Sequence, residues 1–458
     1  MIKDTIAAIS TGMTNSGIGK VRMSGSQAIE IADKVYRSPK GKKHLLNVDS
    51  HTIHYGYIYD GEQLIDEVLV LIMRAPKSYT TEDMVEIDCH GGVVVMKKIL
   101  ETVIKYGARP AEPGEFTKRA FLNGRIDLTQ AEAVIDVINA KNEYALSSSV
   151  KQLRGSVLEK VRDIRKNIIG NVAFIEAAMD DPEHINADHF GEELRENVEE
   201  NIKDIQKLLD SADNGRMLKE GIKTVIVGKP NAGKSSLLNV LVGDDRAIVT
   251  DIAGTTRDTL EESINIHGIP LNIVDTAGIR DTQDVVEKIG VNKAKTFAQD
   301  ADLVIYVVDG STALDENDRE IMEMIRDKKA IVLLNKIDLN LITTKDMLEG
   351  MTKHPVLEIS AASQQGLEEF EGLIRDMFFG GRISFNDEIY ITNVRHKEAL
   401  SQARESLKLV LESIDAGMPE DFFSIDLMNA YDILGGMIGE SAGEDLIDTI
   451  FSDFCMGK

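Results

Sequence analysis

The chain has 458 residues, of which 28% are charged and 43% hydrophobic, and its 77 Asp and Glu against 52 Lys and Arg give a formal net charge of −25. Two cysteines exclude a disulfide framework and a zinc-binding cysteine spacing, and we find neither a signal peptide nor a long apolar run. We therefore expect a cytoplasmic protein without a membrane span. Its length predicts two or three domains, because one hydrophobic core rarely serves so long a chain.

Residues 1–118 mix short apolar runs with turn residues, which predicts an α+β domain. Residues 115–181 contain no proline, and apolar residues recur every three or four positions between 146 and 175. This period predicts one helix with an apolar face, which must pack against other helices. Apolar stripes at 194–209 and 400–414 are its expected partners.

The simplest packing puts these stripes in one helical domain, made of residues 119–217 and 379–458, with residues 218–378 inserted as a separate domain. The predicted fold class is α/β plus α, with an α/β domain inserted into the helical domain and an α+β domain before both. Movement of the inserted domain would then reach the helices at both junctions, near Lys219 and Gly380.

Residues 228–235, Gly-Lys-Pro-Asn-Ala-Gly-Lys-Ser, fit the Gly-x4-Gly-Lys-Ser pattern of a phosphate-binding loop. They follow Ile222–Val227, a predicted buried strand, and precede Ser236–Val242, a predicted helix. In this context, which a chance glycine-rich turn would lack, backbone N–H groups and the helix N-terminus attract phosphate. Lys234 would reach the β- and γ-phosphates, and the Ser235 hydroxyl would bind Mg²⁺.

Three further segments, each after a predicted strand, identify the nucleotide. Asp275–Gly278 offers a carboxylate for the metal's water shell and a glycine N–H for the γ-phosphate. In Asn335–Asp338 the Asp can accept hydrogen bonds from N1 and N2 of guanine, which adenine cannot offer, and Ser360–Ala362 would place a backbone N–H against guanine O6. The set predicts GTP rather than ATP, in contact with Asn231, Ala232, Gly233, Lys234, Ser235, Ser236, Thr250, Asp251, Ile252, Ala253, Gly254, Thr255, Thr256, Asp275, Thr276, Ala277, Gly278, Asn335, Lys336, Asp338, Ser360, Ala361 and Ala362.

Residues 250–258 lie between the phosphate loop and Asp275, where a switch segment is expected. Thr256 would complete the Mg²⁺ shell only while the γ-phosphate is present; otherwise the segment is a flexible loop. Ras-like enzymes orient the attacking water with a Gln directly after Asp-x-x-Gly, but here Ile279 stands there. Arg257 and Arg280 are candidates for the cation that offsets charge between the β- and γ-phosphates, although such arginines are more often solvated.

Residues 113–125, Pro-Gly-Glu-Phe-Thr-Lys-Arg-Ala-Phe-Leu-Asn-Gly-Arg, the motifs at 228–236 and 251–258, and the ending Phe-Cys-Met-Gly-Lys together resemble the MnmE (TrmE) family of tRNA-modifying GTPases over the full length. The resemblance implies that K⁺ replaces an arginine finger and that hydrolysis requires two GTPase domains to meet face to face. It implies that Glu287 orients the water and that Asn231 contributes to catalysis by binding K⁺. The implied K⁺ ligands are Asn231, Thr250, Ile252 and Thr255.

The N-terminal part is similar to the family's folate-binding domain, which forms a constitutive homodimer. The resemblance implies that 5-formyl-tetrahydrofolate or a related tetrahydrofolate binds to Arg22, Glu86, Arg125 and Lys458, although some members have Lys at position 125. From their residue types alone, these four would be ordinary surface charges. Of the thiols, Cys455 is a candidate for function, and Cys89 is expected to be a buried small residue.

A net charge of −25 repels tRNA, so either a local basic patch or a partner subunit must supply most tRNA contacts. The family provides MnmG, an FAD-containing partner, in a heterotetramer or larger complex. The implied function is a K⁺-activated GTPase that acts with MnmG to form 5-carboxymethylaminomethyl or aminomethyl groups on the wobble uridine, position 34, of tRNAs.

The main alternative is a ribosome-assembly GTPase of the Era or Der type. Era would need a Gly-x-x-Gly RNA-binding module downstream, and Der a second GTPase domain. Residues 380–458 instead predict helices that end in Cys-Met-Gly-Lys. A membrane transport GTPase is disfavoured because no spanning segment is found.

Overall fold

The computed structural model describes residues 4–181, 190–243, 261–266, 269–274, 301–379, 391–452, 454–455 and 457. The chain divides into two compact units. The first comprises Met1–Ile135, Gln152–Val198 and Glu405–Lys458, and the second comprises Asp136–Lys151 and Glu199–Arg404. Each unit contains its own sheet, and each is considered separately below.

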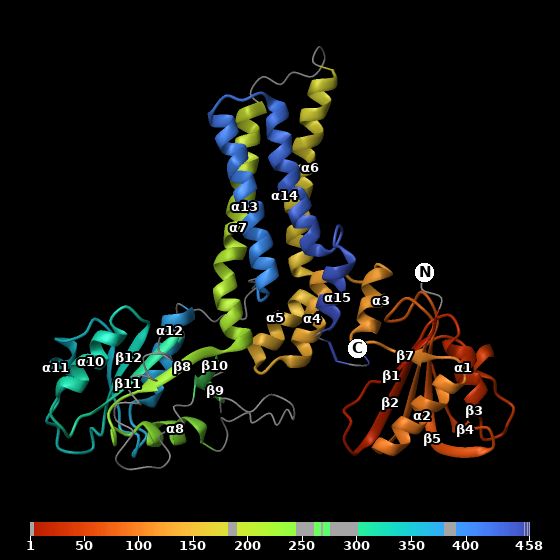
Figure 1. The fold of residues 1–458 in the computed structure, drawn as a ribbon, viewed down its shortest axis with the longest axis horizontal. Helices are drawn as coiled ribbons and strands as arrows, with labels where there is room; N and C mark the ends of the chain where they lie inside the picture. Colours follow the sequence, from red (N-terminus) through yellow and green to blue (C-terminus); the bar gives the residue numbers. More distant parts are fainter. Residues whose placement is uncertain are drawn as a thin grey trace. The chain divides into compact units, whose positions relative to one another are not determined.

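The first unit contains a seven-stranded sheet in the order β3-β4-β5-β6-β2-β1-β7, in which only the β1–β7 pair is parallel (Figure 1). Alternate strand residues such as Val21 and Ile87 face α1 and α2 and form a buried core with Ile99. The elements are β1 Ile6–Ile9, β2 Ser16–Ser24, α1 Ala28–Val35, β3 Tyr36–Arg37, the 3₁₀ helix η1 Leu45–Asn47, β4 Thr52–Asp60, β5 Gln63–Met73, β6 Met84–Gly91, α2 Val93–Lys105 and β7 Arg109–Pro110.

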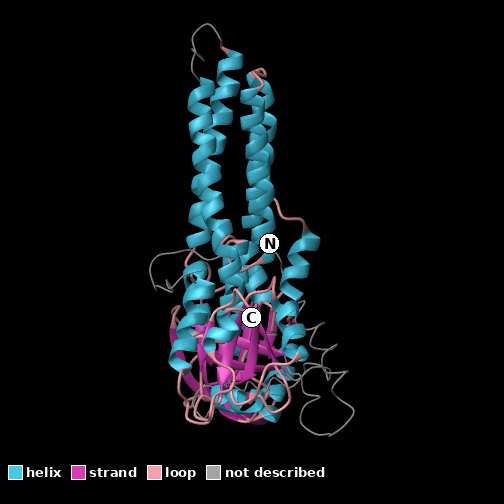
Figure 2. Ribbon diagram, turned by 90° about the vertical axis from the view of Figure 1, so that its left-hand side faces the viewer, coloured by secondary structure: helices cyan, strands magenta, loops and turns pink. Residues whose placement is uncertain are grey.

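Helices complete the first unit, and the long helices α6 and α14 lie side by side (Figures 1 and 2). Between them Arg165 donates to Glu440 over 2.5 Å and lies 4.0 Å from the ring centroid of Tyr431. The helices that belong wholly or partly to this unit are α3 Glu115–Leu122, α4 Leu128–Asn139, α5 Glu143–Leu153, α6 Ser156–Asp180, α7 Phe190–Glu220, α13 Val394–Asp415, α14 Glu420–Ile438 and α15 Glu444–Ser452.

The apolar stripe of residues 146–175 belongs to two helices, so the single helix that its period predicted is wrong. The chain breaks between α5 and α6 because Gly155 has φ +94°, a left-handed conformation that ends one helix and that glycine adopts without strain. The step from Leu153 to Val157 keeps the stripe in phase across the break, which is why the pattern concealed it.

The second unit is built on a six-stranded sheet in the order β13-β12-β11-β8-β10-β9, parallel except for β9–β10. Apolar residues of α8 and α12 pack on one face of this sheet, and those of α10 and α11 pack on the other. The elements are β8 Ile222–Val227, α8 Lys234–Val242, β9 Glu261–Ile266, β10 Ile269–Val274, β11 Leu303–Asp309, α10 Glu316–Ile325, β12 Ala330–Asn335, α11 Lys345–Glu349, β13 Val356–Glu358 and α12 Leu367–Phe379.

This topology confirms the predicted α/β domain and determines where its loops lie. Because β8, β11, β12 and β13 are parallel, their carboxyl ends lie at one edge of the sheet. The phosphate loop follows β8, the Asn335–Asp338 segment follows β12, and Ser360–Ala362 follows β13. These three motifs therefore meet at the same edge, whereas the fourth, Asp275–Gly278, lies outside the described residues.

Candidate nucleotide-binding site

The phosphate loop curls because three of its residues adopt positive φ angles: Gly228 at +153°, Asn231 at +62° and Gly233 at +98°. A Cβ on Gly228 would lie 2.4 Å from the carbonyl oxygen of Val307, so a larger residue cannot occupy that position. Gly233 is the N-cap of α8, whose first residues are Lys234 and Ser235. The loop thus delivers backbone N–H groups and a helix N-terminus to the edge of the sheet, as a phosphate site requires.

Lys234 folds back over this loop, where its Nζ donates to the carbonyl oxygens of Gly228 and Lys229, each at 2.7 Å. Burial lowers its pKa to about 8, because few polar groups replace the water that a charged ammonium loses. An anion at this point would offset that penalty. The phosphate contact of Lys234 stays a prediction.

Asn335 links the phosphate loop to the two base-recognition segments. Its Nδ2 donates to the carbonyl oxygen of Ala232 over 2.9 Å, and its Oδ1 accepts from the backbone N–H of Ala361 over 3.0 Å. The side chain is buried, and a Cβ on Gly233 would lie 2.1 Å from its Nδ2. One amide therefore sets the distance between the phosphate loop and the Ser360–Ala362 turn.

Asp338 is exposed, and one of its carboxylate oxygens accepts from the Ser360 hydroxyl over 2.6 Å. Lys336, at φ +66°, turns the chain between Asn335 and Asp338 and pairs with Asp309 at the end of β11 over 2.6 Å. Burial would raise the pKa of Asp309, but hydrogen bonds from Lys336 and Ser311 outweigh it and lower that pKa. The Ser360 hydroxyl therefore orients the carboxylate of Asp338, and the exposure of Asp338 leaves that carboxylate accessible to a base.

A second lysine of the phosphate loop, Lys229, has a different environment. Its Nζ lies 2.7 Å from a carboxylate oxygen of Asp318, which is 1% exposed, and 3.1 Å from Asp315, the N-cap of α10. Tyr306 donates to the other oxygen of Asp318 over 2.6 Å. Sequence reasoning missed Asp309, Asp315 and Asp318; for Asp309, the available signal was its place directly after the apolar run of residues 303–308.

The structure brings together the predicted residues of the described part of the site: Asn231 to Ser236, Asn335, Lys336, Asp338 and Ser360 to Ala362. The remaining predicted residues of the nucleotide site, and one of the folate site, lie outside the described residues. These are Thr250, Asp251, Ile252, Ala253, Gly254, Thr255, Thr256, Arg257, Asp275, Thr276, Ala277, Gly278, Ile279, Arg280 and Glu287 of the nucleotide site, and Lys458 of the predicted folate site.

The N-terminal sheet pairs two of the predicted folate ligands. Arg22 and Glu86 are direct cross-strand partners on β2 and β6, and Arg22 Nε donates to Glu86 Oε1 over 2.8 Å. Arg22 Nη1 also donates to the carbonyl oxygen of Gly457 over 3.1 Å. Burial would raise the pKa of Glu86, but the hydrogen bond from Lys20 and the charge of Arg22 lower it. For this pair, the expectation of ordinary surface charges is wrong.

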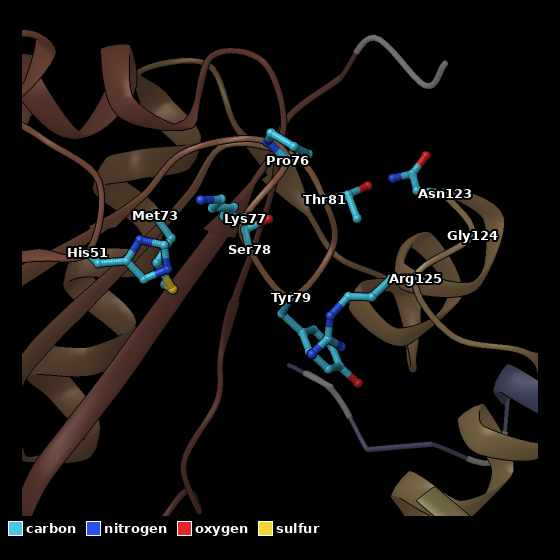
Figure 3. A pocket seen from close by; sticks show the side chains of 10 residues that line it. All are labelled: His51, Met73, Pro76, Lys77, Ser78, Tyr79, Thr81, Asn123, Gly124 and Arg125. Atoms are coloured by element: carbon cyan, nitrogen blue, oxygen red, sulfur yellow. The ribbon is translucent and has the colours of Figure 1, made fainter. Parts of the chain in front are cut away.

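Arg125 lies at a cavity of about 510 Å³ in the same unit (Figure 3). The guanidinium carbon of Arg125 lies 4.8 Å from the ring centroid of Tyr79, and the guanidinium carbon of Arg22 lies 6.0 Å from the same centroid. Cys455 is exposed, and its carbonyl oxygen accepts from Gly114 over 3.4 Å. The cavity is lined by His51, Met73, Pro76, Lys77, Ser78, Tyr79, Thr81, Asn123, Gly124 and Arg125, which include three basic side chains and no acidic one.

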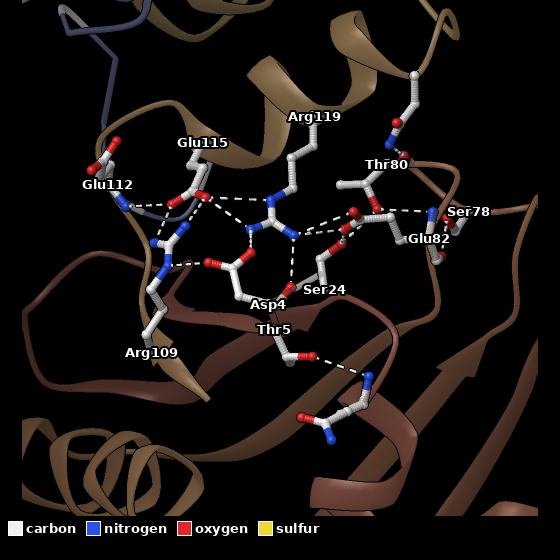
Figure 4. A network of polar contacts seen from close by, with 12 residues as sticks. Asp4, Thr5, Ser24, Ser78, Thr80, Glu82, Arg109, Glu112, Glu115 and Arg119 are labelled. Atoms are coloured by element: carbon white, nitrogen blue, oxygen red, sulfur yellow. Dashed lines mark hydrogen bonds and ion pairs between the residues drawn. The ribbon is translucent and has the colours of Figure 1, made fainter. Parts of the chain in front are cut away.

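A buried ion-pair network holds α3, the helix that precedes Arg125 (Figure 4). Arg119, 1% exposed, donates to Asp4 and Glu115, each over 2.9 Å, and to Glu82 over 3.1 Å. Arg109 donates to Glu115 over 2.5 Å. Burial would raise the pKa of Glu115, but hydrogen bonds from Arg109 and Arg119 lower it. The network stabilises the packing of α3 on the sheet.

Within the described residues, no group of His, Cys, Asp and Glu side chains is arranged to hold a metal ion, and no helix has the length and apolarity to cross a membrane. The first finding does not bear on Mg²⁺ or K⁺, whose predicted ligands are hydroxyl, amide and carbonyl oxygens.

Comparison with known proteins identifies the family. Two family models match, "MnmE helical domain" over residues 128–455 and "GTP-binding protein TrmE N-terminus" over residues 5–125. A protein of Lachnoclostridium phytofermentans described as "tRNA modification GTPase MnmE" is 61% identical over 458 residues, and one of Clostridioides difficile with the same description is 50% identical over 459 residues. Both alignments cover 100% of each chain.

Among solved structures, an Era variant from Aquifex aeolicus bound to GDP and aluminium fluoride is 28% identical and covers 41% of this chain and 67% of its own, with a TM-score of 0.27. That superposition is too poor to support an argument, so the assignment rests on the family models and the full-length relatives. On that evidence the chain belongs to the MnmE (TrmE) family.

Proposed function

We propose that this chain binds and hydrolyses GTP and that hydrolysis serves the modification of tRNA. The observation that carries the proposal is the sheet edge at which Asn335 joins the phosphate loop to the Ser360–Ala362 turn while Asp338 stays exposed. Membership of the MnmE family supports the same activity. A ribosome-assembly switch has no observation in its favour.

Guanine specificity follows from the chemistry of Asp338. Its carboxylate can accept hydrogen bonds from both N1–H and the N2 amino group of guanine, whereas adenine presents an acceptor at N1 and no N2 amino group. The hydrogen bond from Ser360 fixes the carboxylate before a base arrives, which reduces the ordering cost of binding. The Ala361 N–H already donates to Asn335, so the neighbouring N–H of Ala362 is our candidate donor to guanine O6.

At the phosphate end, Lys234 would neutralise the β- and γ-phosphates, and the Ser235 hydroxyl, at the N-terminus of α8, fits one ligand of Mg²⁺. Asn231 is exposed in a left-handed turn, which suits a side-chain oxygen offered to K⁺. When bound, these cations supply positive charge to the phosphates. We propose Thr256 as a further Mg²⁺ ligand, Thr250, Ile252 and Thr255 as further K⁺ ligands, and Glu287 as the residue that orients the water.

We further propose that the chain is a cytoplasmic homodimer that acts with MnmG on the wobble uridine, and that it has domains at 1–118, 119–217 with 379–458, and 218–378. The proposed tetrahydrofolate site uses Glu86 for the pterin edge and Arg125 and Lys458 for the glutamate tail. Arg22 belongs to this site, but its hydrogen bonds to Glu86 and Gly457 favour an indirect role in orienting Glu86 and the C-terminal residues.

Two assays test the proposal at different levels. GTP turnover is measured in KCl and in NaCl, for the wild type, for Asn231→Ala and for the exposed Asn317→Ala as a matched control. We expect K⁺ to accelerate the wild type and the control but not Asn231→Ala; equal rates in both salts would refute the K⁺ proposal. Mass spectrometry of wobble nucleosides from cells that lack the gene tests the biological role, and unchanged uridine modification would refute it.

A further inference from the structure

The second unit contains two crossings between the GTP-binding sheet and the helices. The chain enters the sheet from α7, which ends at Glu220, through Gly221 into β8, and β8 leads directly into the phosphate loop. It returns to the helices at Ile391 and Thr392, just before α13. Any displacement of the phosphate loop that travels along the chain must use one of these crossings.

One carboxylate, that of Asp136, contacts the chain at both crossings. Asp136, on α4, is 6% exposed, and its Oδ1 lies 2.7 Å from the Nζ of Lys219 near the end of α7. Its Oδ2 accepts from the hydroxyl of Thr392 over 3.4 Å. Asp136 therefore connects the entry and the exit of the sheet to the α4–α5 corner, all within one compact unit.

The backbone of Ile391, at the exit from the sheet, also contacts α7. The N–H of Ile391 donates to Ser211 of α7 over 3.1 Å. A Cβ on Gly215 would lie 2.3 Å from the carbonyl oxygen of Ile391, so α7 and this segment approach as closely as glycine permits. They cannot move separately without breaking these contacts.

The end of α7 is in turn fixed to the sheet. Arg216 pairs over 2.7 Å with Asp302, which precedes β11, and the other Asp302 oxygen accepts from the N–H of Lys223 over 3.0 Å. Asn272 of β10 donates to the carbonyl oxygen of Glu220 over 2.5 Å. Rigid contacts thus run from the strands beside the phosphate loop to Lys219, the partner of Asp136.

We propose that Asp136 is a positioning residue that transmits nucleotide-dependent movement of the phosphate-loop strand to the first turns of α13. A buried carboxylate that loses its charged partner is strongly destabilised, so Lys219 must move together with Asp136. Thr392 keeps its hydrogen bond to Asp136 only if it moves with them. Among the described residues, Asp136 contacts none that belong to the nucleotide site. The inference rests on the proposed GTP binding, and it deepens that proposal by naming how the site is coupled to the helices.

Hydrogen exchange of the full-length chain tests the proposal, with GDP compared against GDP plus aluminium fluoride in KCl. In the wild type, exchange in residues 394–404 and 136–151 should differ between the two states by about fivefold or more, the lower end of usual allosteric couplings. Asp136→Asn, which keeps the shape but loses the charge, should reduce that difference to less than about twofold. Its affinity for GDP should stay within about twofold of the wild type, a readout that separates coupling from damage to the site.

Glu220→Gln is the matched control, because it removes an exposed ion pair with Arg216, 3.8 Å long, at the same helix end. It should leave the nucleotide-dependent difference intact. Thr392→Val removes only one hydrogen bond from Asp136 and should halve the difference or reduce it further, so the proposal stays testable if Asp136→Asn fails to fold.

The proposal is overturned if both Asp136→Asn and Thr392→Val keep the wild-type difference, or if the wild type binds GDP and shows no difference in residues 394–404. Failure of the wild type to bind GDP would instead refute the proposed function. Because affinity and exchange are measured on the same samples, the two failures are distinguishable.

Discussion

Replacing Lys234 with Met should abolish nucleotide binding and yet stabilise the protein in nucleotide-free buffer. Burial lowers the pKa of Lys234 from 10.5 to about 8. At 1.36 kcal/mol per pKa unit, keeping this ammonium charged in the folded state costs about 3 kcal/mol at pH 7. Methionine removes that cost and loses the hydrogen bonds to Gly228 and Lys229, worth about 1 kcal/mol each. The net gain is about 1 kcal/mol.

The sign of this difference depends on pH. Because the folded pKa lies below the unfolded value, the unfolded wild type binds more protons between pH 8 and 10.5. The free energy of unfolding of the wild type therefore rises with pH across that window, whereas Lys234→Met lacks this rise. The advantage of the variant should shrink above pH 7 and vanish near about pH 9, where the remaining cost of the charge equals the lost hydrogen bonds. Above that pH the wild type should be the more stable protein.

Lys229→Met is the matched control, since it makes the same substitution in the same loop with the opposite expected sign. Burial would lower the pKa of Lys229, but the hydrogen bonds that it donates to Asp318 and Asp315 raise it. Removing Lys229 leaves the buried carboxylate of Asp318 without its ion pair, at a cost of about 3 kcal/mol or more.

Thermal unfolding of the full chain measures both variants. The relevant transition is the one that GDP shifts in the wild type, and about 1 kcal/mol should move it by about 2–4 °C for a domain of this size. A lower melting temperature for Lys234→Met than for the wild type at pH 7 would refute the reasoning. So would a difference that stays constant from pH 7 to 9.5.

Three other predictions address the remaining features. Asp338→Asn should weaken GTP binding by about tenfold or more and create affinity for xanthosine triphosphate, whose N1–H and O2 match an amide, as nucleotide competition titrations would reveal. Arg119→Met should lower the free energy of unfolding by about 3–5 kcal/mol in urea, and because the pKa of Glu115 is lowered, the wild-type advantage should fall as pH drops below 4.5; an unchanged urea midpoint would contradict this. Iodoacetamide at pH 8 should label exposed Cys455 in the native protein, whereas Cys89, 4% exposed with a pKa raised by burial to about 11, should react only after unfolding, which peptide mass spectrometry checks.

The GTP-binding sheet was predictable because its signals are local. Each of the strands before residues 228, 335 and 360 is a short apolar run that ends at a polar or glycine-rich turn. Parallel strands place those turns at one edge, so the motif order along the chain sufficed to bring them together. Cys89 was likewise confirmed as a buried small residue.

What the sequence could not reveal depends on pairs of residues far apart in the chain. Asn335 was predicted as a base-recognition residue, but its bonds to Ala232 and Ala361 follow only from the packed loops. Arg22 meets Glu86 because β2 and β6 pair in one register, and a shift by one residue would separate them. The break at Gly155 was hidden by an apolar stripe that continues in phase.

The net charge of −25 does not decide whether this protein can bind an anion, because the lysines of the nucleotide site differ in their partners. Lys229 pairs with Asp318 and Lys336 pairs with Asp309, so these two ammonium groups are already compensated by carboxylates. Lys234 donates only to carbonyl oxygens among the described residues, and burial lowers its pKa. An incoming phosphate gains most from Lys234, which pairs with no carboxylate of the described residues, so anion binding here is decided by local pairing and not by the overall charge.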